Sequence, residues 1–493
     1  MNPAITGFVA IVAITVGASQ PHSTFALKSP GAWFFGIPGP TAQPTHGSFI
    51  ALIGVYGGML LLLKAWWTLA QTVRHNPGIR LSHLAGVFAL WVLPLLFIPP
   101  LFSRDVYSYA AQGQMVSQGI SPYHFGPDTL GNSPYVNSVD PLWGNAPAPY
   151  GPLFLGLAGL LATVTAHNVL ATVVGLRLLA LFGVGLIAFF LPKLARQLGR
   201  DPSEAFVLAV LNPVTLLHLV AGAHNDALMI GLMVAGLTVA KRGRPIAGIV
   251  LCTLAGAVKA PALLAVVYIG WDWMGQDLPW RQRVRPVVTS LLLATGVMAF
   301  LSRVTGLGWG WISALSTPGT VRNLISPFTA LGVFAGNLVH GLGLGISPDS
   351  LLALSRSAGL GLAAVVCVIL LINSHKLGSI RALAASLLVV VVFSPVIWSW
   401  YLAWGLILLV PVASGRLYPL IIGLSIASCY VGLPSGHFLL DKLAQVVQGL
   451  VIAGSLVLVL MPSVPDGRWI RAALDRRRPA MAAFEHSRYP PAH

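Results

Sequence analysis

The chain has 493 residues, of which 56% are hydrophobic and only 9% are charged. A soluble globular domain carries about 25% charged residues, so this composition excludes that class and predicts a polytopic membrane protein. The formal net charge of +16 would suggest a nucleic-acid partner in a soluble protein, but here the cations gather in short loops between apolar segments, as cytoplasmic loops of membrane proteins do. We therefore expect membrane lipids, and no nucleic acid, as partners.

Apolar segments recur along the chain, and they predict an all-α protein with about fourteen transmembrane helices. A span needs roughly 20 apolar residues, or fewer where helices are short or broken. The first segment lacks a charged start, which favours a membrane helix over the alternative of an uncleaved signal-like anchor. The predicted spans are residues 4–19, 48–69, 83–101, 170–192, 204–222, 226–240, 246–258, 261–274, 286–304, 351–373, 380–395, 400–414, 417–432 and 442–461.

Two further apolar stretches, residues 151–166 and 325–345, either span the membrane or lie flat on it. The distribution of Lys and Arg decides between these arrangements, because cytoplasmic loops are enriched in both. If both stretches spanned, the cations from Lys193 to Arg285 would face outward. We therefore predict that both lie flat on the outer face and that the N-terminus is inside. Residues 1–465 then form one domain, followed by a basic cytoplasmic tail over 466–493 that is partly disordered.

The longest stretch between apolar segments, residues 102–150, is predicted to lie outside and carries Asp105. A carboxylate just past a membrane helix in a charge-poor protein is a candidate functional residue. The alternative is that Asp105 complements the dipole of a helix that starts there. Residues 106–119 predict an uncharged amphipathic helix in the plane of the interface, with Val106, Tyr109 and Gly113 on one face. Asp105 would then lie at headgroup depth, where an enzyme acting on a lipid-linked substrate needs its base.

The predicted topology brings a second carboxylate to the same outer face. Asp226 follows His224 and Asn225 at the outer start of a span. These three residues are candidates for a sugar-binding site. The alternative is that Asn225 caps the helix and Asp226 complements its N-terminus.

Three cations on this face are candidate phosphate ligands. Lys259 and the nearby Pro261 divide the apolar run 246–274 into two short helices that meet at the outer side. A lysine beside a helix break fits a phosphate contact, and a snorkelling side chain is the alternative. Arg322 is the second candidate. Arg104 is the third, with lipid headgroups as its alternative partner.

Aromatic residues surround the same predicted face, as in the interfacial belts of membrane proteins. We expect one or two of them to stack on sugar rings instead. Our candidates for sugar or acceptor binding are Tyr109, Tyr150, Trp400 and Tyr401. Further aromatic residues on this face are Tyr123, Trp143, Trp309, Trp311 and Trp398.

Several long motifs identify a family resemblance that extends from about Ile5 to Leu460. The chain resembles the actinobacterial polyprenol-phosphate-mannose-dependent α-(1→6)-mannosyltransferases of the GT-C superfamily. The resemblance is nearer to the MptB type than to the MptA type, because HND rather than HNE follows AGA. The motifs are SRDVYSYAAQG, SPY, DPLWGNAPAPYGPLF, LNPVTLLHLVAGAHNDALM, KRGRPIAGIVL and GLGWGW.

The resemblance implies a GT-C fold, a polyprenyl-phosphate-mannose donor and a lipid-linked mannoside acceptor. It also implies a plasma-membrane location with the active site on the outer face, and a product that forms the α-(1→6)-mannan core of lipomannan and lipoarabinomannan. In GT-C enzymes the first large outer loop supplies a catalytic carboxylate, and the matching position here is Asp105. Many relatives have Asp-x-Asp or Glu-x-Asp there, whereas this chain has Ser103-Arg104-Asp105. The missing first carboxylate weakens the case for a divalent metal at the donor phosphate, which stays an alternative, and the implied chemistry requires no cofactor.

The implied reaction inverts a β-linked donor into an α-linked product in a single displacement. Asp105 is then the base that takes the proton of the acceptor hydroxyl. Cations must offset the charge of the phosphate leaving group, and we assign this role to Lys259, Arg322 and Arg104.

Two alternatives to this interpretation stay open. The nearer one is elongation of the distal mannan, as in the MptA type. The other is a secondary transporter or lipid flippase, which predicts charged residues near the membrane midplane and an internal repeat. Polar residues cluster at one predicted face and no repeat is evident in the sequence, so the pattern favours the enzyme.

Overall fold

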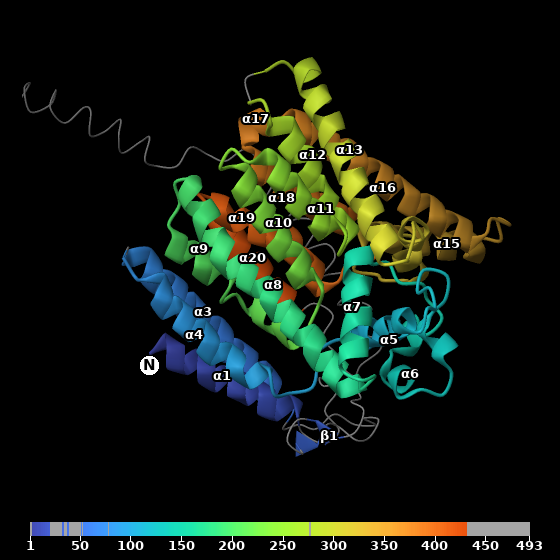
Figure 1. Ribbon diagram of the computed structural model, residues 1–493, viewed down its shortest axis with the longest axis horizontal. Helices are drawn as coiled ribbons and strands as arrows, with labels where there is room; N and C mark the ends of the chain where they lie inside the picture. The colour runs from blue at the N-terminus through green and yellow to red at the C-terminus, as the bar shows by residue number, and fades with distance from the viewer. Residues whose placement is uncertain are drawn as a thin grey trace, which may run out of the picture.

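The computed structural model describes residues 2–19, 32–33, 37–38, 51, 53–76, 78–275 and 278–430. Helices dominate this part of the chain (Figure 1). Its only strands are the two-residue antiparallel pair β1 (Ala32–Trp33) and β2 (Ile37–Pro38). The prediction of an essentially all-helical chain is therefore confirmed for this part. The predicted span 442–461 and the predicted tail 466–493 lie outside the described residues.

An N-terminal layer of apolar helices covers one side of the molecule (Figure 1). Its first helix begins after Asn2, whose side chain accepts a hydrogen bond from the backbone N–H of Ala4, and Pro3 occupies the first helical position. Trp66 attaches the layer to the rest of the protein by donating from its indole N–H to the carbonyl of Val207. The layer consists of α1 (Pro3–Ala18), the π-helical turn η1 (Ile53–Gly57), α3 (Gly58–His75) and α4 (Leu81–Leu95).

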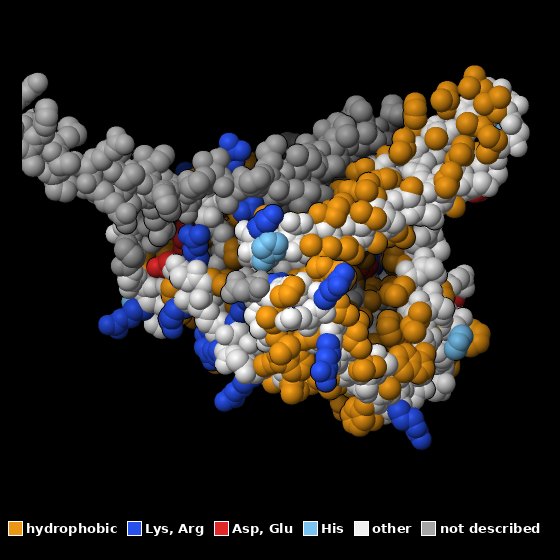
Figure 2. Space-filling model, turned by 90° about the horizontal axis from the view of Figure 1, so that it is seen from above, with side chains coloured by type: hydrophobic (Ala, Val, Ile, Leu, Met, Phe, Trp, Pro, Cys, Tyr) orange, Lys and Arg blue, Asp and Glu red, His pale blue; other side chains and the backbone are white. Residues whose placement is uncertain are grey.

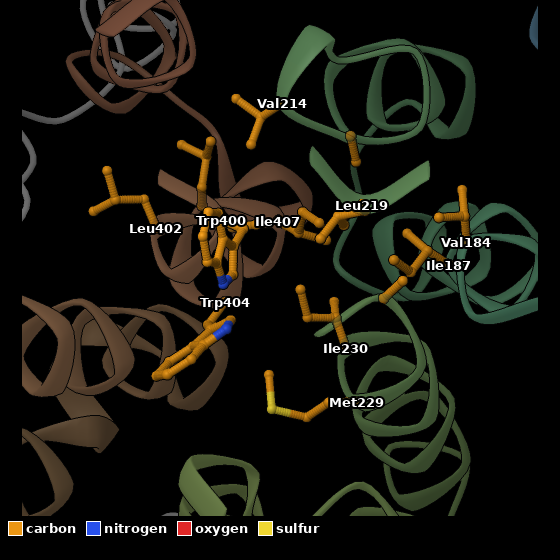
Figure 3. Close-up of a cluster of buried hydrophobic side chains, with 14 of the residues drawn as sticks. Val184, Ile187, Val214, Leu219, Met229, Ile230, Trp400, Leu402, Trp404 and Ile407 are labelled. Atoms are coloured by element: carbon orange, nitrogen blue, oxygen red, sulfur yellow. The ribbon is translucent and has the colours of Figure 1, made fainter. Parts of the chain in front are cut away.

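The centre of the molecule is a bundle in which α10 is buried along most of its length. Apolar side chains from several helices meet there (Figure 3), and Trp400 and Trp404 lie at the edge of this core beside Met229 and Ile407. The bundle contains α8 (Val169–Gln197), α9 (Pro202–Ala209), the π-helical turn η4 (Thr215–Ala221), α10 (Asp226–Ala240), α11 (Pro245–Gly256), η5 (Ala260–Ala262), α12 (Leu263–Asp272), α18 (Ser379–Phe393), η7 (Ser399–Leu402), α19 (Ala403–Leu409), η8 (Val410–Val412) and α20 (Leu417–Tyr430).

The prediction of one continuous span over 204–222 is wrong. The chain forms α9, breaks over residues 210–212 immediately before Pro213, and then forms η4, which meets α10 at an angle of 112°. Proline lacks the N–H that a continuing helix needs, and the side chain of Asn212 accepts from the backbone N–H of Val214 instead. The sharp bend lies beside Ala223, which adopts a positive φ of 54°. This break places residues 222–225 inside the protein.

A second group of helices extends away from the bundle and exposes many large apolar side chains. It includes α13 (Trp280–Val304), α15 (Pro327–Gly341), α16 (Pro348–Ile372) and the short α14 (Trp311–Ala314) and η6 (Thr317–Thr320), whereas α17 (Ser374–Leu377) returns the chain to the bundle and packs against α18. Phe334, Leu354 and Phe300 are about two-thirds exposed, and Figure 2 shows hydrophobic side chains over broad parts of the visible surface. Apolar surface of this extent fits a membrane protein, whose outer side chains face lipid.

Four described helical segments are long and apolar enough to cross a membrane, and the bent pair of η4 and α10 makes a fifth. The four are Ile53–His75, Val169–Gln197, Trp280–Val304 and Pro348–Ile372. Shorter apolar helices lie at most of the other predicted spans. The stretch 151–166 forms α7 (Pro152–Val164), whose 13 residues cover about 20 Å of a hydrocarbon core roughly 30 Å thick. The total of fourteen spans and the flat orientation of α7 and α15 stay predictions.

The helix predicted over 106–119 exists as α5 (Asp105–Ser117), but its predicted position at a surface is wrong. Every residue from Val106 to Met115 is buried. The chain after α5 covers it with η2 (Pro127–Leu130), α6 (Pro134–Ser138) and η3 (Pro141–Trp143). On another side Gly113 admits α7 so closely that a Cβ atom would lie 2.4 Å from the carbonyl oxygen of Ala158. The polar side chains of α5 therefore face protein rather than a membrane surface.

Candidate active site

A buried arginine fixes the turn that leads into α5. Arg177, on α8, donates hydrogen bonds to the carbonyl of Leu95, the last residue of α4, to that of Ile98 beyond it, and to that of Ala221 at the bend before α10. Phe102 then adopts a positive φ of 65°, a conformation that is strained for a bulky residue. These constraints set the direction in which the chain enters α5, and they place Asp105 in its first turn.

Asp105 is a partly buried carboxylate that lies beside a histidine. Its side chain is 18% exposed, and its Oδ2 lies 3.6 Å from Nδ1 of the fully buried His224. Burial raises the pKa of the Asp105 carboxyl to about 6, and the positive charge of Lys259 opposes part of that rise. A carboxyl with this pKa is mostly ionised at neutral pH and binds a proton readily, as a general base must.

Lys259 and Asp226, two predicted site residues, form a buried ion pair. Lys259 Nζ donates to both carboxylate oxygens of Asp226 at 2.9 and 3.0 Å. The indole N–H of Trp404 donates to the same carboxylate. Lys259 reaches this position because its extended backbone, followed by Pro261, separates α11 from α12. Asp226 is therefore already neutralised and hydrogen-bonded.

The start of α7 is attached to this helix break by backbone hydrogen bonds. The N–H groups of Gly151 and Leu153 donate to the carbonyls of Val258 and Ala257 at 3.0 and 3.1 Å. Only glycine permits this approach, because a Cβ atom at Gly151 would lie 2.2 Å from the oxygen of Ala257. The end of the long loop, with Tyr150, is thereby held next to Lys259.

The four aromatic candidates all join this cluster. His224 stacks on Trp400 with ring centroids 3.8 Å apart. Tyr401 lies 4.3 Å from Lys259 Nζ, measured to the ring centroid, and packs on Trp404. Tyr109 meets Tyr150 edge to face, and its hydroxyl lies 3.5 Å from His224 Nδ1. The aromatic rings therefore enclose both the carboxylate of Asp105 and the ammonium group of Lys259.

Two cavities of very different size meet at these residues. The narrow cavity, beside Asp105, has a volume of about 30 Å³. The wide cavity, beside Lys259, has a volume of about 700 Å³. They share Pro149, Pro318 and Tyr401. The narrow cavity is also lined by Asp105, Ser108, Gln112, Trp143, Ala146, Pro147, Tyr150, Thr317 and Trp398; the wide one by Lys259, Ala260, Pro261, Leu315, Ser316, Gly319, Thr320, Ala353, Arg356, Ser357, Leu360, Val390, Ser394, Pro395, Val396 and Trp404.

The structure does not bring Arg322 into the cluster. Its side chain is 61% exposed, pairs with Asp349, which is 76% exposed, and lines neither cavity. The arginine that lines the wide cavity is Arg356, which donates hydrogen bonds to the carbonyls of Gly319 and Val321. The assignment of Arg322 to donor phosphate thus loses its geometric basis, because the loop before it turns the side chain outward.

Several buried polar groups at the site have no hydrogen-bond partner among the described residues. They include both polar side-chain atoms of Asn225 and Nε2 of His224. Ser108 Oγ and Gln112 Oε1, on α5, belong to the same set. Buried polar atoms left unpaired by protein are uncommon, and at a cavity they indicate groups that meet a ligand or water.

Sequence reasoning missed four contributors to this site. Ser108 and Gln112 follow Asp105 at helical spacings of three and seven, and that spacing was the available signal. Trp404 lies one helical turn after Trp400, so the two share a face. Arg177 gave no signal, because its role depends on carbonyls from distant segments. Across the described ranges, no group of three or more His, Cys, Asp or Glu residues could hold a metal ion, and the expected absence of a cofactor stays an expectation.

Comparisons with known proteins cover most of the chain. The family described as "Alpha-(1->6)-mannopyranosyltransferase, N-terminal domain" matches residues 4–275, and that described as "MptB C-terminal domain" matches residues 328–462. Alpha-(1->6)-mannopyranosyltransferase A of Mycobacterium tuberculosis is 35% identical over 434 residues, which cover 84% of this chain and 81% of the relative. Alpha-(1->6)-mannopyranosyltransferase B of Corynebacterium glutamicum is 30% identical over 467 residues, which cover 88% of this chain and 76% of the relative.

Proposed function

The chain belongs to the alpha-(1→6)-mannopyranosyltransferase family, and we propose that it transfers mannose from a polyprenyl-phosphate donor to a lipid-linked mannoside. It is a membrane glycosyltransferase by that membership and by its apolar helices. The observation that carries the proposal is the junction of two cavities, with a proton-accepting carboxylate at the narrow one and a buried ammonium group at the wide one.

Asp105 is the base on the acceptor side. The acceptor hydroxyl oxygen attacks C1 of the donor mannose while the bond from C1 to the phosphate oxygen breaks. The hydroxyl proton passes to Asp105, and the polyprenyl phosphate leaves with the bonding electrons. One such displacement inverts the anomeric carbon, so a β-linked donor gives the α-linked product. The raised pKa of Asp105 supports this role, because the carboxylate is ionised at neutral pH and still basic enough to receive the proton.

Lys259 is the group that meets the donor phosphate. Two of its three N–H donors go to Asp226, which leaves one donor for a phosphate oxygen. Asp226 thereby holds the ammonium group in place and also reduces its net charge. His224 and Asn225 lie beside this pair with unpaired polar atoms and are suited to sugar hydroxyls. Arg104 lines neither cavity, and it stays a candidate second cation only because its Nε is buried without a partner in the described part of the chain.

The wide cavity suits the lipid portion of the donor. Apolar side chains such as Leu315, Leu360 and Val390 line most of it, with Lys259 and Arg356 as its two cations. An apolar chain buries well against such a wall, since each buried methylene contributes about 0.8 kcal/mol. The charged phosphate would then lie between the wide cavity and the narrow one.

Our proposal also includes the topology of the protein in the membrane. We infer a GT-C architecture with about fourteen spans in the plasma membrane and the active site on the outer face, because the cationic loops then lie inside. A tag placed at Arg242 should be protected in intact cells, and one at Asp128 should be accessible. Labelling of both tags from one side would contradict this topology.

We propose that the physiological product is the α-(1→6)-mannan core of lipomannan and lipoarabinomannan. The comparisons include relatives named for both the A and the B type at similar identity. Elongation of the distal mannan is therefore the second candidate function. Defined acceptors of increasing length distinguish the two, because an elongating enzyme prefers the longer ones.

Reconstitution of the purified protein with polyprenyl-phosphate mannose and a short mannoside acceptor tests the proposal. We expect an α-(1→6)-linked product that requires both substrates. Movement of a labelled solute or lipid across the proteoliposome membrane, without transfer of sugar, would instead support the transporter alternative.

A further inference from the structure

We propose that Ser108, Gln112 and Asp105 form a pocket that binds the primary hydroxymethyl group of the acceptor sugar and so selects the 6-hydroxyl. This inference rests on the proposed function, because it assigns the narrow cavity to the acceptor. It adds two specificity-determining residues and a chemical reason for the linkage.

The three residues lie along one face of α5 at positions i, i+3 and i+7, and all three line the narrow cavity. Ser108 is one turn from Asp105 and Gln112 about two turns. Side chains on a helix tilt toward its N-terminus, so the long side chain of Gln112 extends back toward Asp105. The helix therefore presents a base and two hydrogen-bonding groups to a single small space.

Two polar side-chain atoms at this cavity are free to hydrogen-bond to a ligand. Ser108 and Gln112 are each only 4% exposed, yet Ser108 Oγ and Gln112 Oε1 hydrogen-bond to no other described group. A buried hydroxyl or amide oxygen without a partner is unfavourable, so a group that pairs with both is bound more tightly. Neither side chain is needed to hold α5 in place through those atoms.

The size of the cavity selects the chemistry of the group that enters. A volume of about 30 Å³ holds about two small groups, since one water-sized probe needs roughly 10–15 Å³. A hydroxymethyl group has two heavy atoms, one carbon and one oxygen, and it projects from the sugar ring. A secondary hydroxyl is attached directly to the ring, so its oxygen could reach Asp105 only if ring atoms also entered. Trp143, Tyr150 and Trp398 are among the bulky side chains that line this small cavity.

Binding of two matched sugars to the full-length reconstituted protein tests this pocket. The probes are an alkyl α-mannoside and its 6-deoxy analogue, which has hydrogen in place of the 6-hydroxyl. The wild-type protein should bind the intact mannoside about tenfold more tightly, as expected for one or two hydrogen bonds. In Ser108→Ala and Gln112→Leu the ratio of the two dissociation constants should fall toward one.

Matched substitutions elsewhere on α5 control for general damage to the helix. Neither Ser117 nor Gln114 lines the narrow cavity. Ser117 hydrogen-bonds to the carbonyl of Gln114, and the side chain of Gln114 pairs with His167. Ser117→Ala and Gln114→Leu should keep the wild-type ratio. A ratio that is unchanged in both Ser108→Ala and Gln112→Leu would overturn the inference, as would a wild-type ratio near one.

A parallel transfer assay separates this inference from the proposed function. If the wild-type protein transfers mannose but the binding ratio does not respond to the two substitutions, only the hydroxymethyl pocket is wrong. If it transfers no mannose under any condition, the proposed function fails and the pocket loses its acceptor.

Discussion

The first turns of α5 and α10 each carry an aspartate, and the two carboxylates have different surroundings. Asp226 on α10 has no exposed surface, and its two oxygens receive hydrogen bonds from Lys259 and Trp404. Asp105 on α5 keeps 18% of its side chain exposed, and its Oδ2 lies 3.6 Å from Nδ1 of His224. An aspartate in the first turn of a helix can therefore have either of two roles. A carboxylate already neutralised by a buried cation positions that cation, whereas one left at the edge of a cavity can accept a proton.

The largest expected effect comes from replacing the free carboxylate. Asp105→Asn keeps the volume of the side chain but cannot accept the acceptor proton, so kcat should fall about 10²–10⁴-fold. Donor binding, measured separately, should change little, because the donor phosphate meets Lys259. The matched control is Asp128→Asn, which alters an exposed aspartate of the same loop and should keep full turnover. Retained turnover in Asp105→Asn would make Asp226 the next candidate for the base.

The second prediction concerns the contribution of the Lys259–Asp226 pair to the stability of the protein. Lys259→Ala leaves Asp226 buried without its cation and should lower the free energy of unfolding by about 3–5 kcal/mol. A second substitution in the same chain, Asp226→Asn, removes the unpaired charge and should restore most of that loss in thermal unfolding assays. The KM for the donor should stay raised in the double variant, because the phosphate contact is still missing. Full recovery of the donor KM would show that Lys259 serves stability alone.

The smallest effect is expected for replacement of Arg322, which lies outside the candidate active site. Arg322→Ala removes an exposed pair, and exposed pairs contribute only about 0–1 kcal/mol, so turnover and thermal stability should change little. Arg356→Ala should raise the KM for the donor more, because Arg356 holds the loop at Gly319 and Val321 against the wide cavity. Kinetics of the two variants, measured side by side, check this order. The reverse order would restore Arg322 as the phosphate ligand.

The sequence was enough to predict that several residues far apart in the chain gather in one region, although Arg322, predicted to be among them, does not join. Span boundaries and cationic loops placed Asp105, Asp226 and Lys259 on one face, and the structure brings all three together with His224 and Trp400. Such an argument works because a membrane protein has only two sides, and each span fixes the side of the next loop.

The sequence did not show how deeply each helix is buried or which charged residues pair with one another. Burial of α5 depends on how the later loop folds over it, and the pair of Lys259 with Asp226 joins residues 33 positions apart. Arg322 was assigned correctly to a loop, but nothing in its local sequence told which way its side chain turns. The interruption at Pro213 was visible in the sequence, yet the apolar character of its neighbours favoured a continuous span. Arg177 acts through backbone carbonyls, which no residue pattern specifies.

The pH dependence of the transfer reaction tests the role of Asp105 most directly. Because the pKa of this carboxyl is raised to about 6, the protonated and inactive form gains population as the pH falls through that value. For the wild-type protein, kcat/KM should be constant above the pKa and fall about tenfold per pH unit below it. The donor phosphodiester stays ionised over this range, and any contribution of His224 would persist when Asp105 is replaced. We expect the residual activity of Asp105→Asn to be independent of pH across the same interval. A wild-type profile without an acid limb, or an Asp105→Asn profile that keeps it, would contradict the assignment of Asp105 as the base.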